Sequence, residues 1–236
     1  MLDKINNNIQ NKIKRNYKYI SVFLLYLLYQ IGFIPSIINA FGFNLYKLPK
    51  IPRLLTITIT DLIYIALLLI MFKDKIKEGY ADLKQNFKAR VNISATCWAI
   101  GCIIMFISTT IISFIVKKDV SSNEALVRES IKLAPLYMLF TCSIVAPIFE
   151  EMVFRKALYG IIRKKWLFIV ASGLSFGLLH VIGSYTSPLD FLYVIPYGAM
   201  GFSFAYLLTK TNNIILPILI HMIHNTILVI SQILGG

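Results

Sequence analysis

Two adjacent carboxylates stand at the end of an apolar run in the segment APIFEEMVFRKALYG, residues 146–160. A charged side chain at membrane depth costs about 2.5–3.5 kcal/mol to insert, so the pair needs compensation. On an α-helix Glu151 and Arg155 lie four residues apart on one face and can pair, whereas Glu150 is turned about 100° away. Glu150 therefore lacks a local partner, as a general base requires. The alternative is an interfacial charge cluster at a helix end.

All three histidines lie in the second half of the chain, inside apolar runs. In FGLLH, Phe176 precedes His180 by four residues, so its ring can pack beside the imidazole. In HMIHN, His221 and Asn225 share a helix face, and the asparagine amide can donate to developing negative charge, as in an oxyanion hole. His224 is offset from His221 by about 60°, and its contribution stays open. For each histidine the alternative is a hydrogen bond to a neighbouring backbone.

The spacing of these motifs predicts their depth in the membrane. The turn near Lys165 lies fifteen residues from both Glu150 and His180, so two helical arms place them at similar depth, about 22 Å from the turn. His221 lies only about eight residues into its own run, which begins at residue 214. The depths then agree only if the helices are kinked or extend beyond the bilayer. Four prolines within the runs allow kinks: Pro135, Pro147, Pro196 and Pro217.

The elements that must position these residues are long apolar runs. The chain has 236 residues, is 57% hydrophobic and has a mean hydropathy of +0.71. A membrane-spanning helix needs roughly 20 apolar residues. We predict an all-α polytopic membrane protein with about seven transmembrane helices, six to eight being possible. The runs are 19–43, 54–72, 93–116, 133–149, 166–182, 191–208 and 214–234.

The distribution of positive charge predicts the orientation. The net charge is +13, and alternate connections between the runs hold 17 and 7 of the 24 Lys and Arg residues. Because cytoplasmic loops carry the excess of basic residues, we place the N-terminus in the cytoplasm of a multi-pass cell-membrane protein. The charge then reports topology and contact with the lipid bilayer, not nucleic-acid binding. We expect the first run to be a retained helix, since it is too long for a signal peptide.

We predict one membrane-embedded unit with two parts. Residues 1–132 form the N-terminal transmembrane helices with basic cytoplasmic segments, and residues 133–236 form the catalytic core. In the first part Asp61 is either functional or paired with a neighbouring hydroxyl or water. The segment 73–90 is an amphipathic helix on the cytoplasmic leaflet or a solvated linker. The three cysteines, which show no paired spacing, act as small buried hydrophobes: Cys97, Cys102 and Cys142.

Three short motifs carry a resemblance to a known family. EEMVFR at 150–155, FGLLH at 176–180 and HMIHN at 221–225 match, in order, the motifs EExxxR, FxxxH and HxxxN. These are the motifs of the CAAX protease and bacteriocin-processing (Abi) family, whose eukaryotic branch includes the Rce1-type prenyl protease. The resemblance covers roughly residues 133–234, a little under half of the chain.

The resemblance implies an intramembrane endopeptidase whose active site lies in a helix-lined cavity open to the cytoplasmic side. It implies that Glu150 works with His180 to activate the water that attacks the scissile carbonyl. His221 and Asn225 would then stabilise the oxyanion. The residues that would support the site are Glu151, Arg155 and Phe176.

Two mechanisms and two classes of function stay open. Glu150, His180 and His221 could supply three zinc ligands, but the chain lacks the HExxH helix of zincins, which favours a mechanism without metal. The expected substrate is a membrane-associated peptide or protein, such as a bacteriocin, pheromone or signalling precursor. The alternative is a non-catalytic membrane interaction, immunity or regulatory protein. The sequence does not identify the substrate or the oligomeric state.

Overall fold

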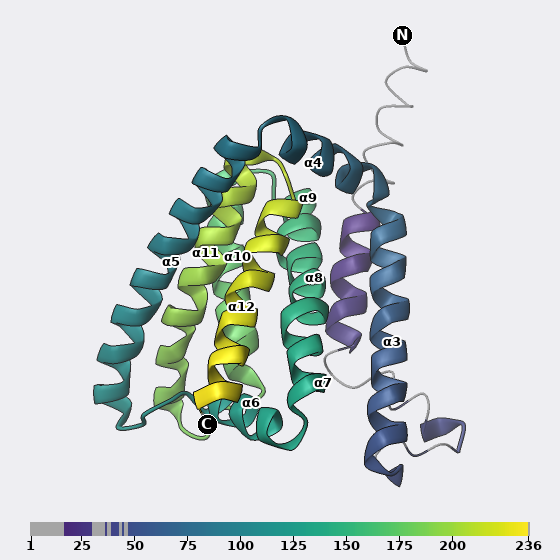
Figure 1. The fold of residues 1–236 in the computed structure, drawn as a ribbon, viewed down its shortest axis with the longest axis vertical. Coiled ribbons are helices and arrows are strands. Elements are labelled where there is room, and N and C mark those ends of the chain that lie inside the picture. Colours follow the sequence, from purple (N-terminus) through teal and green to yellow (C-terminus); the bar gives the residue numbers. More distant parts are fainter. Residues whose placement is uncertain (1–16, 30–35, 37–38, 43, 45–46, 236) are drawn as a thin grey trace.

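The computed structural model describes residues 17–29, 36, 39–42, 44 and 47–235. The regular elements of these residues are helices; the long ones run side by side, and α4 and α6 lie across the two ends of the bundle (Figure 1). In chain order they are Tyr17–Tyr29, α3 Lys50–Met71, α4 Lys73–Gln85, α5 Phe87–Val116, α6 Ser122–Leu133, α7 Pro135–Phe140, η2 Thr141–Val145, α8 Ala146–Glu150, η3 Glu151–Ala157, α9 Leu158–Ile161, α10 Lys165–Ile182, η4 Pro188–Tyr193, α11 Val194–Thr211 and α12 Ile215–Gly235.

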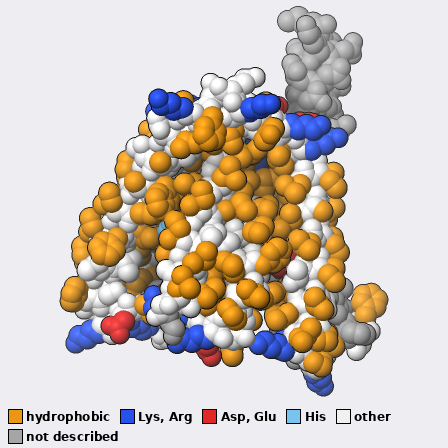
Figure 2. Space-filling view, in the orientation of Figure 1, with side chains coloured by type: hydrophobic (Ala, Val, Ile, Leu, Met, Phe, Trp, Pro, Cys, Tyr) orange, Lys and Arg blue, Asp and Glu red, His pale blue; other side chains and the backbone are white. Residues whose placement is uncertain are grey.

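Six helices are long and apolar enough to cross a membrane, and Tyr17–Tyr29 is a shorter apolar helix. The predicted all-α polytopic fold is therefore confirmed. Figure 2 shows a broad apolar belt with Lys and Arg side chains at its two ends, as lipid and headgroups require. The basic segment 1–16 lies outside the described residues.

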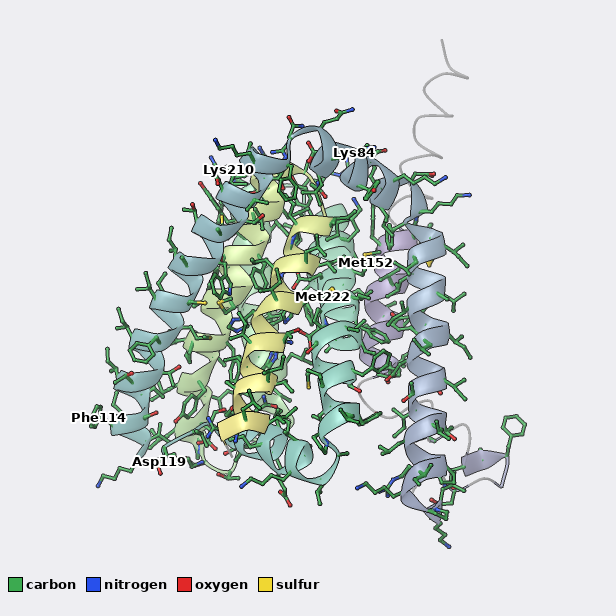
Figure 3. The ribbon with its side chains drawn as sticks, viewed as in Figure 1. Lys84, Phe114, Asp119, Met152, Lys210 and Met222 are labelled. Atoms are coloured by element: carbon green, nitrogen blue, oxygen red, sulfur yellow. The ribbon has the colours of Figure 1, made fainter. Side chains whose placement is uncertain are left out.

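The ends of the bundle agree with the predicted alternation of connections. Figure 3 places Lys84 and Lys210 at one end and Phe114 and Asp119 at the other. The connections 73–90 and Lys210 thus share a side, and 117–132 lies opposite, as the charge pattern predicts. Which end faces the cytoplasm stays a prediction.

The helix that carries the two glutamates continues beyond the apolar run 133–149. A continuous helical run extends from Pro135 to Ile161, as the pairing of Glu151 with Arg155 on one helix face requires. Within it two π-helical segments, η2 and η3, flank α8. π-Segments inside α-helices occur mostly as single turns and often at functional sites. Glu150 and Glu151 therefore lie inside a helix that extends past its apolar run, which is one of the two conditions under which the sequence predicts a common depth with His221.

The four prolines take different places in the helices. Pro135 begins α7, and Pro196 and Pro217 are the third residues of α11 and α12. In the first turn a missing N–H has no intrahelical partner to lose, so Pro135 and Pro217 lie where helices start. Pro147 and Pro196 lie inside the continuing helical runs Pro135–Ile161 and Pro188–Thr211. Of the two kinks that the sequence allows near the site, the structure therefore leaves the position at Pro147 inside a run and places Pro217 at a helix start.

Small residues bring α10 and α11 into close contact. A Cβ on Gly177 would lie 2.5 Å from the carbonyl oxygen of Val194, and one on Gly201 would lie 2.9 Å from the Cα of Gly173. Such small residues let membrane helices approach backbone to backbone. This contact holds the FxxxH helix against its neighbour.

The predicted amphipathic segment 73–90 is helical over α4, which crosses from α3 to α5 (Figure 1). Only part of the apolar stripe that makes this segment amphipathic is buried. Ile76 and Leu83 pack against the core, whereas Tyr80 and Phe87 are each 64% exposed. The helix therefore uses half of the stripe to hold the bundle together.

A polar lock ties α4 to the connection between α11 and α12. Arg90 donates to both carboxylate oxygens of Asp82 at 2.8 and 2.6 Å, and the Asn213 amide donates to Asp82 at 2.8 Å. The same amide also donates to the carbonyl of Gly79 at 2.8 Å. A Cβ on Gly79 would lie 2.5 Å from the Asn213 side chain, so the contact requires glycine.

This lock predicts a pH dependence of stability. The Arg90 side chain holds the pKa of Asp82 below its ordinary value of 3.8. Because the folded-state pKa is lowered, the stabilisation is complete at neutral pH and is lost as the pH falls below about 4. Asp82→Asn should lower the free energy of unfolding by about 1–2 kcal/mol at pH 7. The thermal midpoints of wild type and Asp82→Asn should converge near pH 3. The control is Asp74→Asn, an exposed change on the same helix, which should leave the midpoint unchanged at pH 7 and at pH 3. A constant difference between Asp82→Asn and wild type across this range would contradict the assignment.

Candidate functional site

The centre of the candidate site is a buried ion cluster between η3 and α12. The Nε of Arg155 lies 3.1 Å from Glu151 Oε2, and both side chains are 0% exposed. The contact is an ion pair without the alignment of a hydrogen bond. On its other side Glu151 Oε1 lies 2.9 Å from Nδ1 of His221. The predicted pairing of Glu151 with Arg155 is present, and it extends to a histidine 70 residues away.

His221 stands between the two carboxylates. Its Nδ1 faces Glu151, and its Nε2 lies 3.8 Å from Glu150 Oε2. That Glu150 oxygen is buried and has no hydrogen-bond partner among the described residues, although the side chain as a whole is 14% exposed. The cluster is electrically neutral when His221 carries both ring protons. Glu150 is therefore the member of the cluster that a substrate or water could reach.

Aromatic rings enclose the guanidinium of Arg155. Its central carbon lies 4.5 Å from the ring centre of Phe176 and 5.5 Å from that of Phe204. One nitrogen donates to the carbonyl of Gly201 at 3.4 Å. Cation–π contact of this kind strengthens when water is excluded. Phe176 therefore supports the cluster as predicted, and Phe204 and Gly201 of α11 are additions that no motif in the sequence marks.

His180 is joined to the ion cluster through the Phe176 ring, which contacts both. Its Nδ1 lies 2.9 Å from the carbonyl oxygen of Phe176, four residues earlier in α10. A carbonyl only accepts, so Nδ1 carries a proton and Nε2 of the neutral ring is left as an acceptor. The Phe176 ring packs on His180 at 4.6 Å and also contacts His221 at 5.8 Å. Within the described ranges no hydrogen bond or ion pair joins His180 to Glu150, the partner that the family resemblance implies.

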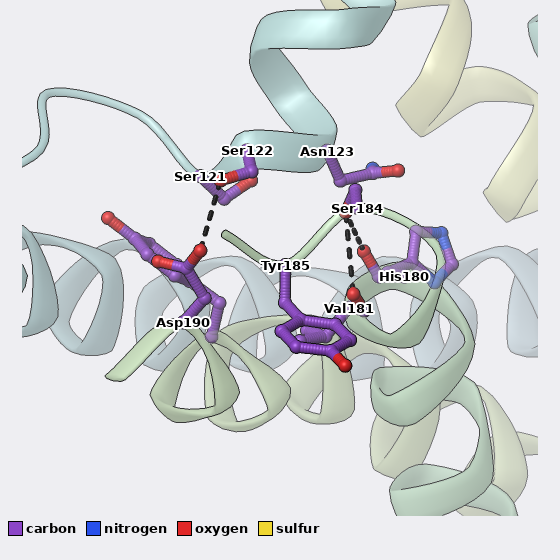
Figure 4. Close-up of a pocket in the computed structure, with 9 residues that line it drawn as sticks. Ser121, Ser122, Asn123, His180, Val181, Ser184, Tyr185 and Asp190 are labelled. Atoms are coloured by element: carbon purple, nitrogen blue, oxygen red, sulfur yellow. Dashed lines mark hydrogen bonds between the residues drawn. The ribbon is translucent and has the colours of Figure 1, made fainter. Parts of the chain in front are cut away.

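A small pocket opens beside His180, with room for about one water molecule. Figure 4 shows the start of α6 and the end of α10 around it. The α6 helix lies at the end of the bundle opposite Lys84 and Lys210 (Figures 1 and 3). In the predicted orientation this pocket faces away from the cytoplasm, unlike the cavity that the resemblance implies.

Asn225 replaces a missing backbone hydrogen bond in the helix that carries the two glutamates. In η2 the N–H of Ala146 bonds to the carbonyl of Thr141, five residues earlier. In that register the next donor would be Pro147, which has no N–H, so the carbonyl of Cys142 is left without its helical partner. The Asn225 amide donates to this carbonyl at 2.9 Å. One of its two amide hydrogens is thus occupied, and the second is available to a ligand.

This geometry predicts how two roles of Asn225 can be separated. Asn225→Ala should lower kcat by about 10²–10³-fold if the amide stabilises the oxyanion. Pro147→Ala restores a backbone N–H that can reach Cys142, so adding it should repair a purely structural defect. We expect the double variant to regain thermal stability and stay inactive. Recovery of full activity in the double variant would show that Asn225 acts only on the backbone.

The residues named as zinc ligands do not form a ligand set in this arrangement. Glu150 approaches His221, but His180 is turned to its own helix backbone. Within the part of the chain that the structure describes, no group of three or more His, Cys, Asp or Glu side chains is placed to hold a metal ion. We therefore derive no step through a metal.

The other polar residues singled out in the sequence lie outside the cluster. Asp61 is buried and accepts a hydrogen bond from Tyr29, so the predicted pairing with a neighbouring hydroxyl is present. His224 accepts from Trp98 at 3.3 Å on the α5 side of α12. All three cysteines are free thiols.

Comparisons with known proteins agree with the motifs. Residues 132–227 match the family described as type II CAAX prenyl endopeptidase Rce1-like. All seven predicted site residues fall in this range. No solved structure matches the chain at a significant level.

Two relatives are membrane proteins of bacteria. YdiL of Bacillus subtilis, whose name describes a candidate membrane peptidase, is 37% identical over 48% of this chain and 44% of its own length. The membrane-embedded CAAX protease MroQ of Staphylococcus aureus is 32% identical over 58% of each chain. The chain thus spans about half the length of these relatives. Residues 132–227 of this chain are therefore similar to the Rce1-like endopeptidases, and the two relatives are named as membrane peptidases.

Proposed function

We propose that this protein is an intramembrane endopeptidase that hydrolyses a peptide bond with a water activated by Glu150. The observation that carries the proposal is the position of His221 between a fully buried glutamate and a partly accessible one. A purely structural ion pair needs only Glu151 and Arg155. The second carboxylate, with an oxygen that has no partner among the described residues, is suited to take a proton from a reactant.

In the proposed attack step Glu150 removes a proton from water while the water oxygen bonds to the scissile carbonyl carbon. His180 assists by accepting a hydrogen bond from the water at Nε2, since its Nδ1 proton is held by a backbone carbonyl. A bound peptide that brings its carbonyl between α8, α10 and α12 would meet both groups. Positioning of this kind supplies much of the rate enhancement of hydrolytic enzymes.

The negative charge that develops on the carbonyl oxygen then needs donors. With both ring protons, His221 presents Nε2–H on the side that faces Glu150, while Glu151 holds Nδ1–H. The second amide hydrogen of Asn225 is the other donor. When the carbon–nitrogen bond breaks, Glu150 returns its proton to the leaving amine, which gives a carboxylic acid and an amine.

The proposed substrate is a membrane-associated peptide or protein. The cluster lies within apolar helices, so a substrate must present its cleavage site at membrane depth. The names of the two relatives, a membrane peptidase and a membrane-embedded CAAX protease, support this class. Bacteriocin, pheromone and signalling precursors belong to it.

Single alanine variants at the proposed catalytic positions test this function against a non-catalytic role. Peptide processing should be lost in Glu150→Ala, His180→Ala and His221→Ala membranes that hold normal amounts of protein. If every variant still supports the cellular phenotype, the protein acts by binding and the proposal fails. Exhaustive chelation with elemental analysis tests zinc separately: activity that disappears on chelation and returns with zinc would replace the glutamate mechanism.

A further inference from the structure

The ring of His180 contacts two aromatic side chains. Phe176 packs on it with ring centres 4.6 Å apart and planes inclined by 42°. Tyr197 of α11 stacks on it with ring centres 4.7 Å apart and planes inclined by 21°. Phe176 belongs to the FxxxH motif, whereas Tyr197 lies in no motif and comes from a different helix.

The hydroxyl of Tyr197 is fixed at the start of α6. It lies 2.7 Å from the Ser121 hydroxyl and accepts from the Asn123 amide at 3.3 Å. Ser121 in turn caps α6, because its oxygen accepts the N–H of Glu124 at 3.1 Å. Tyr197 is therefore anchored at both ends, by its backbone in α11 and by its hydroxyl at α6.

The start of α6 is itself tied to the connection after α10. Asp190 is 2% exposed and accepts from Lys118 at 2.7 Å and from Ser122 at 3.1 Å. Figure 4 shows the Ser122–Asp190 bond beside the pocket that His180 lines. The anchor of Tyr197 is thus a braced segment, not an isolated contact.

We propose that Tyr197 is a positioning residue for His180, and this inference rests on the proposed function. The hydrogen bond to the Phe176 carbonyl is a single neutral bond, and when it breaks the His180 ring can rotate about its Cβ–Cγ bond. The pocket, which has room for about one water molecule, leaves part of the ring without a packed side chain. The stacked ring of Tyr197 prevents rotation of the His180 ring and keeps Nε2 directed at the water that Glu150 deprotonates. It touches no reacting atom in this scheme.

Kinetics of two variants test the role. Tyr197→Leu removes the stacking ring and should lower kcat roughly 30–100-fold with KM unchanged within about twofold, since small misplacements of catalytic groups have effects of this size. Tyr197→Phe keeps the ring and loses the anchor, so it should recover most of the activity. Tyr206→Leu is the matched control, because Tyr206 lies on the same helix and is 44% exposed. Unchanged kcat in Tyr197→Leu would overturn the proposal.

A second measurement does not depend on peptidase activity. Diethyl pyrocarbonate acylates unprotonated imidazole nitrogens, and peptide mass spectrometry gives the rate at each histidine of the purified protein. In Tyr197→Leu the rate at His180 should rise several-fold, while the rates at His221 and His224 stay as in wild type and report that the fold is kept. Equal rates at His180 in wild type, Tyr197→Phe and Tyr197→Leu would overturn the positioning role. If wild type cleaves no peptide, the proposed function fails and these rates alone decide whether Tyr197 holds the ring.

Discussion

Glu150→Gln is expected to lower kcat for peptide cleavage by between about 10² and 10⁴-fold, the usual contribution of a general base. The amide has almost the shape of the carboxylate but cannot accept the proton of the attacking water. Because the side chain is partly exposed and makes no hydrogen bond through its buried Oε2 within the described residues, the thermal midpoint should change little. Initial rates and thermal unfolding of the purified protein in detergent measure both effects.

The matched control for this change is Glu78→Gln, the same substitution at an exposed ion pair of α4. It should leave both kcat and the thermal midpoint unchanged. A Glu150→Gln protein that is folded and cleaves at the wild-type rate would remove Glu150 from the mechanism. A variant that is inactive because it unfolds would indicate a structural role instead.

Arg155→Met is expected to have the largest effect on stability. Arg155 is the largest fully buried side chain among the described residues, and its loss leaves the two carboxylates of the cluster with His221 as their one remaining cationic partner there. Breaking a buried ion pair on one side typically costs about 3–5 kcal/mol. The thermal midpoint should fall sharply, or the protein should fail to accumulate in membranes.

Two further variants separate the buried charge from simple loss of packing. Glu151→Gln combined with Arg155→Met removes both charges and should recover part of the stability lost by Arg155→Met alone. Arg128→Met breaks the exposed pair with Glu124 on α6 and should cost less than about 1 kcal/mol. If the double variant is less stable than Arg155→Met, the buried charge is not the cause.

The local parts of the site could be predicted because they follow helix geometry. The pairing of Glu151 with Arg155 and the packing of Phe176 on His180 both join residues four apart, and both are present. The apolar runs likewise predict the spans, because the bilayer requires a minimum length of apolar helix. The apolar run of the glutamate helix ends at residue 149 although the helix continues, because Glu151 and Arg155 neutralise each other inside the protein.

The contacts between helices could not be predicted in this way. His221 could be placed on a helix but not between the two glutamates, because residues 70 positions apart meet only through the packing of α8, η3 and α12. The donation of Asn225 to the carbonyl of Cys142 depends on a π-helical register that no sequence period indicates. Tyr197 carries no signal at all in the sequence, since a tyrosine in an apolar run usually belongs to the core.

Cleavage of membrane-anchored peptides by the purified protein in liposomes tests the central claim most directly. A peptide library is incubated in water enriched in ¹⁸O with the wild-type protein or with Glu150→Gln, and the products are read by mass spectrometry. We expect the wild-type protein to release paired fragments that carry ¹⁸O in the new carboxyl group, and Glu150→Gln to release at least about 10²-fold less. Folded wild-type protein that cleaves no member of the library, or equal cleavage by Glu150→Gln, would contradict the account.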